Sequence, residues 1–213
     1  MTATTTAVPR ARLDFALRPM LVFWEVTRAC QLACFHCRAS ATEGALPGEL
    51  TTTEGFDLID QVAGFGRPFP ILVLTGGDCL LRPDLFELVA HAKGLGIPVA
   101  LSPSVTPQLT PAKIEQMVAS GINAVSISLD GALPATHDGV RGIPGHFEDT
   151  IKAITALSAA GLTHLPRLYL TGASYRGVGI ASCVADAERK AQDVARDVSE
   201  PLADVRPLTE VTS

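Results

Sequence analysis

Four short aliphatic runs alternate with helical patterns along the middle of the sequence. They are rich in β-branched residues and cover residues 20–26, 70–75, 97–102 and 124–129. Such runs are typical of strands that are buried on both faces of a parallel sheet. Repeated strand–helix alternation gives right-handed β/α units, so the sequence predicts an α/β fold, an open or closed β/α barrel. In these barrels the chemistry is carried by loops at the carboxyl ends of the strands.

Helix signals fall between these runs. Thr51 and Glu54 form a capping box at the start of the first expected helix. Asp84 can cap the second helix, and the pair Thr110–Pro111 opens the third. A fourth helix is expected over about residues 147–160. The helices therefore supply the crossovers that parallel strands require.

Composition excludes several classes of protein. With 47% hydrophobic and 18% charged residues, the 213-residue chain has the make-up of an ordinary globular protein. A net charge of −5 without a basic block argues against nucleic acid as a partner, and the apolar runs are too short to cross a membrane. Residues 1–12 are expected to form a disordered tail without signal-peptide features. The five cysteines are an odd number, which favours a metal site in a reducing cytoplasm over disulfides.

Three of the cysteines form one tight loop after the first run. Cys30, Cys34 and Cys37 have the spacing C-x3-C-x2-C. Thiolates are the usual ligands of iron–sulfur clusters, and three of them leave the fourth iron of a cube open to a small molecule. The alternative is a structural zinc knuckle completed by His36, although its adjacency to Cys37 makes joint tetrahedral ligation awkward.

This loop resembles the signature of the radical S-adenosylmethionine (SAM) superfamily. The position before the third cysteine is usually aromatic in that family and is His36 here. The resemblance implies a [4Fe–4S] cluster that cleaves SAM to a 5′-deoxyadenosyl radical. It also implies an external electron donor of the ferredoxin or flavodoxin type. Arg28 matches the polar lead-in that is common in the family, and a plain surface cation is the equal alternative.

Gly76, Gly77 and Asp78 follow the second run. They resemble the family's Gly-Gly-Glu motif, which implies that they bind the amino group of SAM, whereas a lone Gly-Gly-Asp is usually a turn. A side chain at Gly77 is then expected to weaken SAM binding and to leave the iron content intact. The next residue, Cys79, is expected to be a small buried side chain.

Hydroxyls and a carboxylate end the third and fourth runs. By resemblance they imply contacts with the ribose and carboxylate of SAM, although alone they are more often turns or helix caps. These residues are Ser102, Ser104, Ser128 and Asp130. Arg141 resembles the arginine that helps to hold SAM, and the nearby His137 belongs either to that segment or to the surface.

The resemblance covers about residues 13–162 and is closest to the branch associated with haem and peptide-cofactor maturation. Only four β/α units are present where the family has six, so an incomplete barrel is expected. Residues 163–199 resemble the strand–turn–helix at the flavin-binding end of protoporphyrinogen oxidases, through Gly172, Gly177, Val178 and Gly179. Because the chain lacks an N-terminal dinucleotide-binding unit, this foreign β–α segment is not expected to bind FAD. Residues 200–213 are expected to form a polar tail.

The sequence thus predicts a radical SAM enzyme with an unknown substrate. The alternatives are a non-catalytic cluster-binding remnant and a fragment of a flavin-dependent protoporphyrinogen oxidase. Colour after anaerobic purification separates them, because a cluster is brown and a flavin is yellow.

Overall fold

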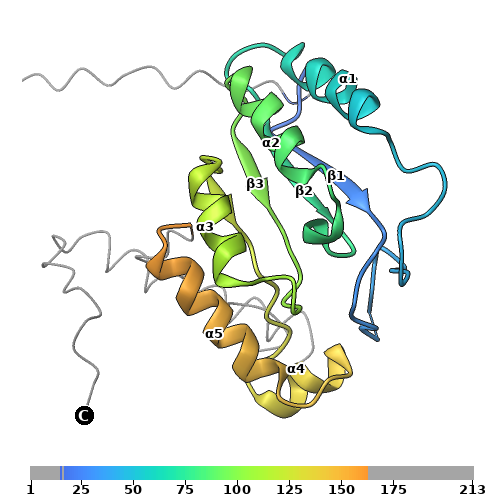
Figure 1. The fold of residues 1–213 in the computed structure, drawn as a ribbon, viewed down its shortest axis with the longest axis vertical. Coiled ribbons are helices and arrows are strands. Elements are labelled where there is room, and N and C mark those ends of the chain that lie inside the picture. Colours follow the sequence, from blue (N-terminus) through green and yellow to red (C-terminus); the bar gives the residue numbers. More distant parts are fainter. Residues whose placement is uncertain (1–14, 16, 163–213) are drawn as a thin grey trace, which may run out of the picture.

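The computed structural model describes residue 15 and residues 17–162 (Figure 1). The strands are β1 (Leu21–Thr27), β2 (Ile71–Gly76), β3 (Val99–Leu101) and β4 (Ala124–Val125). The helices are α1 (Thr52–Ala63), the short 3-10 helix η1 (Cys79–Leu81), α2 (Leu85–Gly94), α3 (Pro111–Ala119), α4 (Pro134–Arg141) and α5 (His146–Ala159). The expected segments at 1–12, 163–199 and 200–213 lie outside the described residues.

The four strands form one parallel sheet in the order β1-β2-β3-β4. Leu21 of β1 pairs with Ile71 of β2, and Leu72 of β2 pairs with Val99 of β3. This confirms the predicted α/β fold of successive β/α units. The fourth strand is shorter than the run at 124–129, although Ser126 N still donates a 2.9 Å hydrogen bond to Leu101 O.

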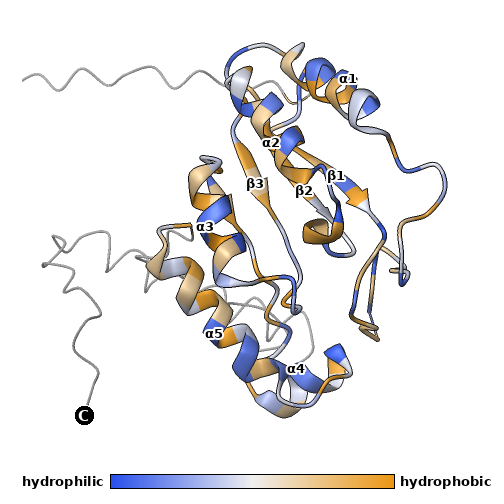
Figure 2. Cartoon of the chain, viewed as in Figure 1, coloured by the Kyte–Doolittle hydropathy of each residue, from blue (hydrophilic) through white to orange (hydrophobic). Residues whose placement is uncertain are grey.

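One face of the sheet packs against the helices. Leu72, Leu74, Val99 and Leu101 are fully buried there, and Figure 2 shows hydrophobic residues along β2 and β3. The helices contribute a matching set of buried residues: Ile59 and Val62 from α1, Leu85, Leu88, Val89 and Ala92 from α2, Met117 from α3 and Leu157 from α5. Burying these aliphatic side chains is worth roughly 1.5–3 kcal/mol each, so this layer holds the strand ends in place.

The opposite face of the sheet is open within the part of the chain that the structure describes. Leu21 and Ile71 keep 37% of their surface exposed and Phe23 keeps 60%. A closed barrel would bury these side chains inside its wall. The described residues therefore form part of a barrel, as the sequence predicts.

Helix caps follow the sequence at two positions and differ at a third. The Thr51–Glu54 capping box is present, and Thr110 accepts a hydrogen bond from Lys113 N at the start of α3. Asp84 occupies the N-cap position of α2 but makes no side-chain cap. Its carboxylate instead accepts hydrogen bonds from Thr52 Oγ1 and from the Arg82 guanidinium, and the guanidinium is a stronger partner than a backbone amide because it is charged.

Helix α4 was not expected from the sequence, and α5 begins close to where the fourth helix was predicted. The two pack against each other beyond the fourth strand (Figure 1). Among the described residues, no helix combines the length and apolar character that a membrane span requires.

Candidate functional site

The predicted motifs meet around one cavity at the carboxyl ends of the strands. Its volume is about 230 Å³. All of the predicted site residues except Asp78 and Asp130 line it: Cys30, Cys34, His36, Cys37, Gly76, Gly77, Ser102, Ser104, Ser128 and Arg141. Four separate strand ends thus contribute to one polar site, as the fold predicts.

The base of the cysteine loop is fixed by Arg28. Its Nε donates to Ala39 O at 3.0 Å, and its Nη2 donates to Ser40 O. Its backbone N–H donates to Glu49 Oε1 at 2.9 Å. Burial raises the pKa of Glu49, but hydrogen bonds from Arg28 N, Leu46 N and the Thr27 hydroxyl outweigh it and leave the pKa lowered. Arg28 therefore connects the start of the cysteine loop to its end through hydrogen bonds.

Each of the three loop sulfurs accepts a hydrogen bond. Cys30 Sγ accepts from Leu32 N at 3.4 Å, and Cys37 Sγ accepts from Ala41 N at 3.4 Å. Cys34 Sγ accepts from Arg141 Nη1 at 3.5 Å. Hydrogen-bond donors of this kind surround the sulfur ligands of clusters in iron–sulfur proteins.

The donor set fits an iron–sulfur cluster better than zinc. A zinc knuckle would need His36 as a fourth ligand beside the three cysteines. In a cluster each thiolate binds a separate iron, so the three sulfurs can line one cavity without converging on one point. The imidazole of His36 faces the Asp130 carboxylate at 3.4 Å, which gives it a partner other than a metal.

The two glycines let β2 approach the base of the loop. Gly76 has a φ of +130°, and a Cβ there would overlap Thr27 O. A Cβ at Gly77 would overlap Ala29 O and lie 2.6 Å from Arg28 O. Gly77 N also donates to Thr27 O at 2.9 Å. The glycines thus make their close approach to the chain's own backbone at residues 27–29, directly before the cysteine loop.

Asp78 lies in the core and not in the cavity wall. Its fully buried carboxylate accepts from Thr106 Oγ1 at 2.7 Å, Leu80 N at 3.1 Å and Ser104 N at 3.4 Å. Burial raises its pKa, and these hydrogen bonds offset only part of that increase. The sequence implies that Asp78 contacts the SAM ammonium. In the structure, its carboxylate oxygens instead accept hydrogen bonds from Thr106 and Ser104 in the loop that follows β3.

The serines act as links between strand ends. Ser104 Oγ donates to Gly77 O at 2.9 Å and lies 3.8 Å from Cys30 Sγ. Ser102 Oγ accepts from Ser126 Oγ at 3.0 Å. Both hydroxyls also line the cavity, where they remain candidates for the polar groups of a ligand.

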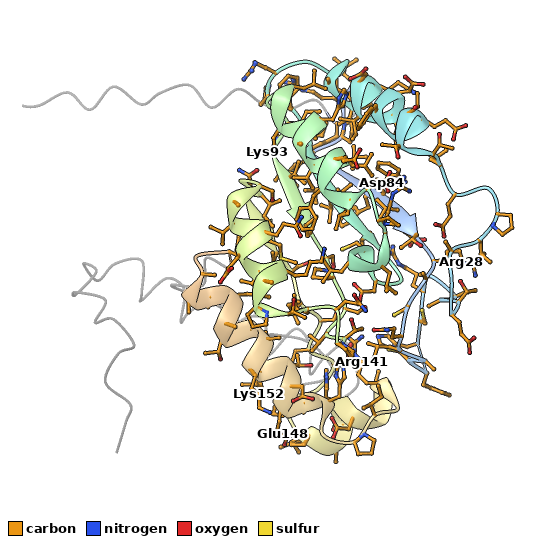
Figure 3. The ribbon with its side chains drawn as sticks, viewed as in Figure 1. Arg28, Asp84, Lys93, Arg141, Glu148 and Lys152 are labelled. Atoms are coloured by element: carbon orange, nitrogen blue, oxygen red, sulfur yellow. The ribbon has the colours of Figure 1, made fainter. Side chains whose placement is uncertain are left out.

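Asp130 does not line the cavity but holds Arg141, which does, in place. Its Oδ2 accepts from Arg141 Nε at 2.6 Å, and these side chains are only 15% and 11% exposed. Figure 3 labels Arg141, the last residue of α4, and Arg28, which lies on the separate connection that follows β1. A partly buried pair of this geometry holds the guanidinium in one orientation.

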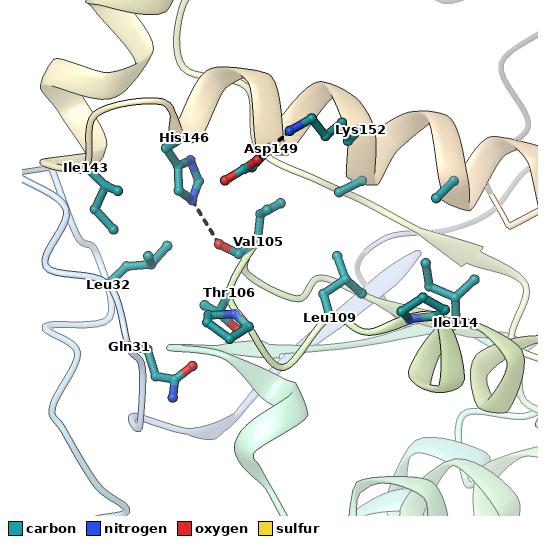
Figure 4. A pocket seen from close by; sticks show the side chains of 14 residues that line it. Gln31, Leu32, Val105, Thr106, Leu109, Ile114, Ile143, His146, Asp149 and Lys152 are labelled. Carbon is teal, nitrogen blue, oxygen red and sulfur yellow. Dashed lines mark hydrogen bonds and ion pairs between the residues drawn. The ribbon is translucent and has the colours of Figure 1, made fainter.

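A buried histidine pair connects Asp130 to the loop after β3. Asp130 N donates to His137 Nδ1 at 3.1 Å, and His146 Nε2 donates to Val105 O at 2.9 Å (Figure 4). When both rings are neutral, His137 Nε2 therefore donates the 2.9 Å hydrogen bond and His146 Nδ1 accepts it. His137 is fully buried, so of the two alternatives that the sequence leaves open for this residue, the surface position is wrong. No local pattern in the sequence indicates a role for His146, because its partners lie 9 and 41 residues away.

The pKa of His137 lies below its ordinary value of 6.5. Burial is the main cause; the Arg141 and His146 charges lower it further, while Asp130 and Asp138 oppose the shift. As pH falls below 6.5, the unfolded chain takes up this proton before the folded chain does. We therefore expect the free energy of unfolding to decrease between pH 7.5 and 5.5, by up to about 1.4 kcal/mol per unit of pKa difference.

Urea unfolding at these two pH values checks this expectation. His137→Gln should show a smaller decrease than the parent chain, because it removes the proton that distinguishes the two states. Equal decreases in both proteins would show that His137 does not control this pH dependence.

A second, larger cavity of about 700 Å³ lies between α5, α3 and the loop after β3 (Figure 4). Leu32, Val105 and His146 line both cavities and so form the wall between them. Its charged residues, Asp149 and Lys152, pair with each other at 3.0 Å. The histidine pair thus stabilises the partition next to the cysteine site.

Comparison with known proteins gives a family match over most of the chain. The sequence pattern of the Radical SAM superfamily matches residues 24–174. The match passes residue 162, where the sequence predicts a departure from the family. The comparisons give no support to the expected protoporphyrinogen-oxidase-like segment at 163–199, which stays a prediction.

Among curated relatives, the AdoMet-dependent heme synthase of Nitratidesulfovibrio vulgaris is 44% identical over 154 residues, 72% of this chain and 41% of that protein. The AdoMet-dependent heme synthase of Methanosarcina barkeri is 44% identical over 142 residues, 67% of this chain and 40% of that protein. The mycofactocin maturase MftC of Mycobacterium ulcerans is 38% identical over 160 residues, 74% of this chain and 42% of that protein. The chain thus spans about two fifths of the length of these relatives.

Two solved structures share the fold. Methylornithine synthase (PylB) has a TM-score of 0.55 and 20% identity, covering 68% of this chain and 43% of that chain. The enzyme anSMEcpe with bound AdoMet has a TM-score of 0.54 and 13% identity, covering 80% of this chain and 48% of that chain. The four-stranded parallel sheet, the cysteine loop at its carboxyl edge and the family match agree. This chain belongs to the radical SAM superfamily.

Proposed function

We propose that Cys30, Cys34 and Cys37 hold the [4Fe–4S] cluster that the family uses, and that the same cavity binds SAM. The observation that carries the proposal is the single cavity in which all three thiols meet glycines, serines and an arginine from the later strand ends. When bound, such a cluster supplies an electron that cleaves SAM to a 5′-deoxyadenosyl radical.

The chain's own residues would position these groups. Arg28 fixes the shape of the cysteine loop, and Gly77 holds that loop against β2. The Ser102, Ser104 and Ser128 positions offer polar atoms to the ribose and carboxylate of SAM. His36 lies beside the third cysteine, with 58% of its side chain exposed, where it can contact the adenine end of the ligand. The Gly76–Gly77 backbone, in place of the Asp78 carboxylate, would face the SAM ammonium.

The relatives support a proposal for the class of reaction. Identity is 44% with two proteins named heme synthases and 38% with a peptide-cofactor maturase. These values favour chemistry in haem maturation, with peptide-cofactor maturation as the second candidate. An external donor of the ferredoxin or flavodoxin type would supply the electron.

Formation of 5′-deoxyadenosine tests the enzymatic proposal. The full chain is reconstituted anaerobically with iron and sulfide and then mixed with dithionite and SAM. We expect 5′-deoxyadenosine to accumulate, and to accumulate faster with an iron porphyrin than with a short peptide if the haem assignment is right. A chain that binds iron but releases no 5′-deoxyadenosine would instead be the non-catalytic cluster-binding protein.

A further inference from the structure

The C-terminal end of α4 contacts the cysteine loop at two adjacent positions. Phe35 N donates to Val140 O at 2.9 Å, and Arg141 Nη1 donates to Cys34 Sγ at 3.5 Å. One contact fixes the backbone beside Cys34, and the other reaches its sulfur. These two hydrogen bonds fix the position of Cys34 relative to a helix that lies more than 100 residues later in the sequence.

Cys34 differs from the other two cysteines in the charge of its donor. Cys30 and Cys37 accept from the neutral backbone amides of Leu32 and Ala41. Cys34 alone, among the hydrogen bonds of the described residues, accepts from a charged side chain. Hydrogen bonds from ionised donors are stronger, so the three sulfurs are not equivalent.

The guanidinium that reaches Cys34 is held rigidly. Arg141 Nε donates to Asp130 Oδ2 at 2.6 Å, and Nη2 donates to Ser128 O at 3.4 Å. Its side chain is only 11% exposed, so solvent and salt screen its charge poorly. The carboxylate of Asp130 reduces the net charge, but the guanidinium is the group that contacts the sulfur.

We infer that Arg141 is a positioning residue for Cys34 and that it raises the reduction potential of the cluster. One electron entering the cluster makes it more negative, without forming or breaking a bond. A fixed cation and hydrogen bond at a ligating sulfur stabilise that more negative state. This role goes beyond the SAM contact implied for Arg141, because it operates before SAM binds. The inference rests on the proposed cluster ligation by Cys34.

The test is an anaerobic redox titration of the reconstituted full chain without SAM, followed by the electron paramagnetic resonance signal of the reduced cluster. Arg141→Met removes the charge and the hydrogen bond and should move the midpoint potential to a more negative value. Arg38→Met is the matched control, because Arg38 adjoins Cys37 but is 76% exposed and pairs with Glu25. Its shift should be smaller. Arg141→Lys keeps the charge and should recover part of the shift.

An Arg141→Met potential equal to that of the parent chain, or shifted no further than in Arg38→Met, would overturn the inference. If Arg141→Met does not retain its iron, Arg141→Lys decides: a negative shift supports the inference and an unchanged potential refutes it. Failure of the parent chain itself to bind a cluster would instead reject the proposed function.

Discussion

Cys34→Ala should lose most of the iron that the reconstituted chain binds. Three thiolates hold a [4Fe–4S] cluster in this arrangement, so the parent chain is expected to carry about four irons. Without Cys34 the cluster loses the ligand next to the α4 contact and retains only Cys30 and Cys37. Iron and sulfide analysis of the anaerobically reconstituted proteins, together with their brown absorbance, measures the loss.

Cys79→Ala is the matched control for this experiment. Cys79 is fully buried in the core outside the cavity, and burial together with the Asp78 charge raises the pKa of its thiol. A protonated, enclosed thiol is a poor ligand, so this variant should keep its iron. Full retention of iron by Cys34→Ala would contradict the cluster assignment.

Gly77→Ala is expected to destabilise the fold and to reduce iron binding at the same time. The added methyl group would overlap the carbonyls of Arg28 and Ala29, which directly precede Cys30. Forcing atoms into such a packed place costs about 3 kcal/mol. Urea unfolding of the cluster-free chain and iron analysis after reconstitution measure the two effects.

This expectation differs from the prediction made from sequence, in which a side chain at Gly77 weakens SAM binding and leaves the iron content intact. Gly139→Ala in α4 is the control, since a Cβ there meets nothing within 4 Å. It should stabilise the helix by up to about 1 kcal/mol. A Gly77→Ala chain that unfolds like the parent and keeps its iron would show that the loop base can move aside.

Most of the fold follows from local patterns in the sequence. The four aliphatic runs locate the strands because buried parallel strands have no polar face. The Thr51–Glu54 and Thr110–Pro111 signals locate the starts of α1 and α3 because caps depend on neighbouring residues. The positions of the site residues then follow from topology, since parallel strands bring their carboxyl ends to one edge.

Features that depend on distant partners could not be predicted. Asp78 follows a strand like the other site residues, but Thr106 and Ser104, more than 25 residues away, hold its carboxylate in the core. Helix α4 was missed because it begins without a side-chain cap and contains Gly139. The burial of His137 depends on His146 and Thr150, which reach it only when α5 packs beside α4.

The order of the strands has a consequence for synthesis on the ribosome. Among the described strands, β2, β3 and β4 each pair with the strand before them in the sequence, so the sheet can grow in the direction of translation, one unit at a time. The thiols emerge directly after the first strand, but Arg141 is translated more than 100 residues later. A nascent chain therefore displays its cysteines well before it can complete their surroundings. Iron loading should accordingly follow, and not accompany, the translation of α4.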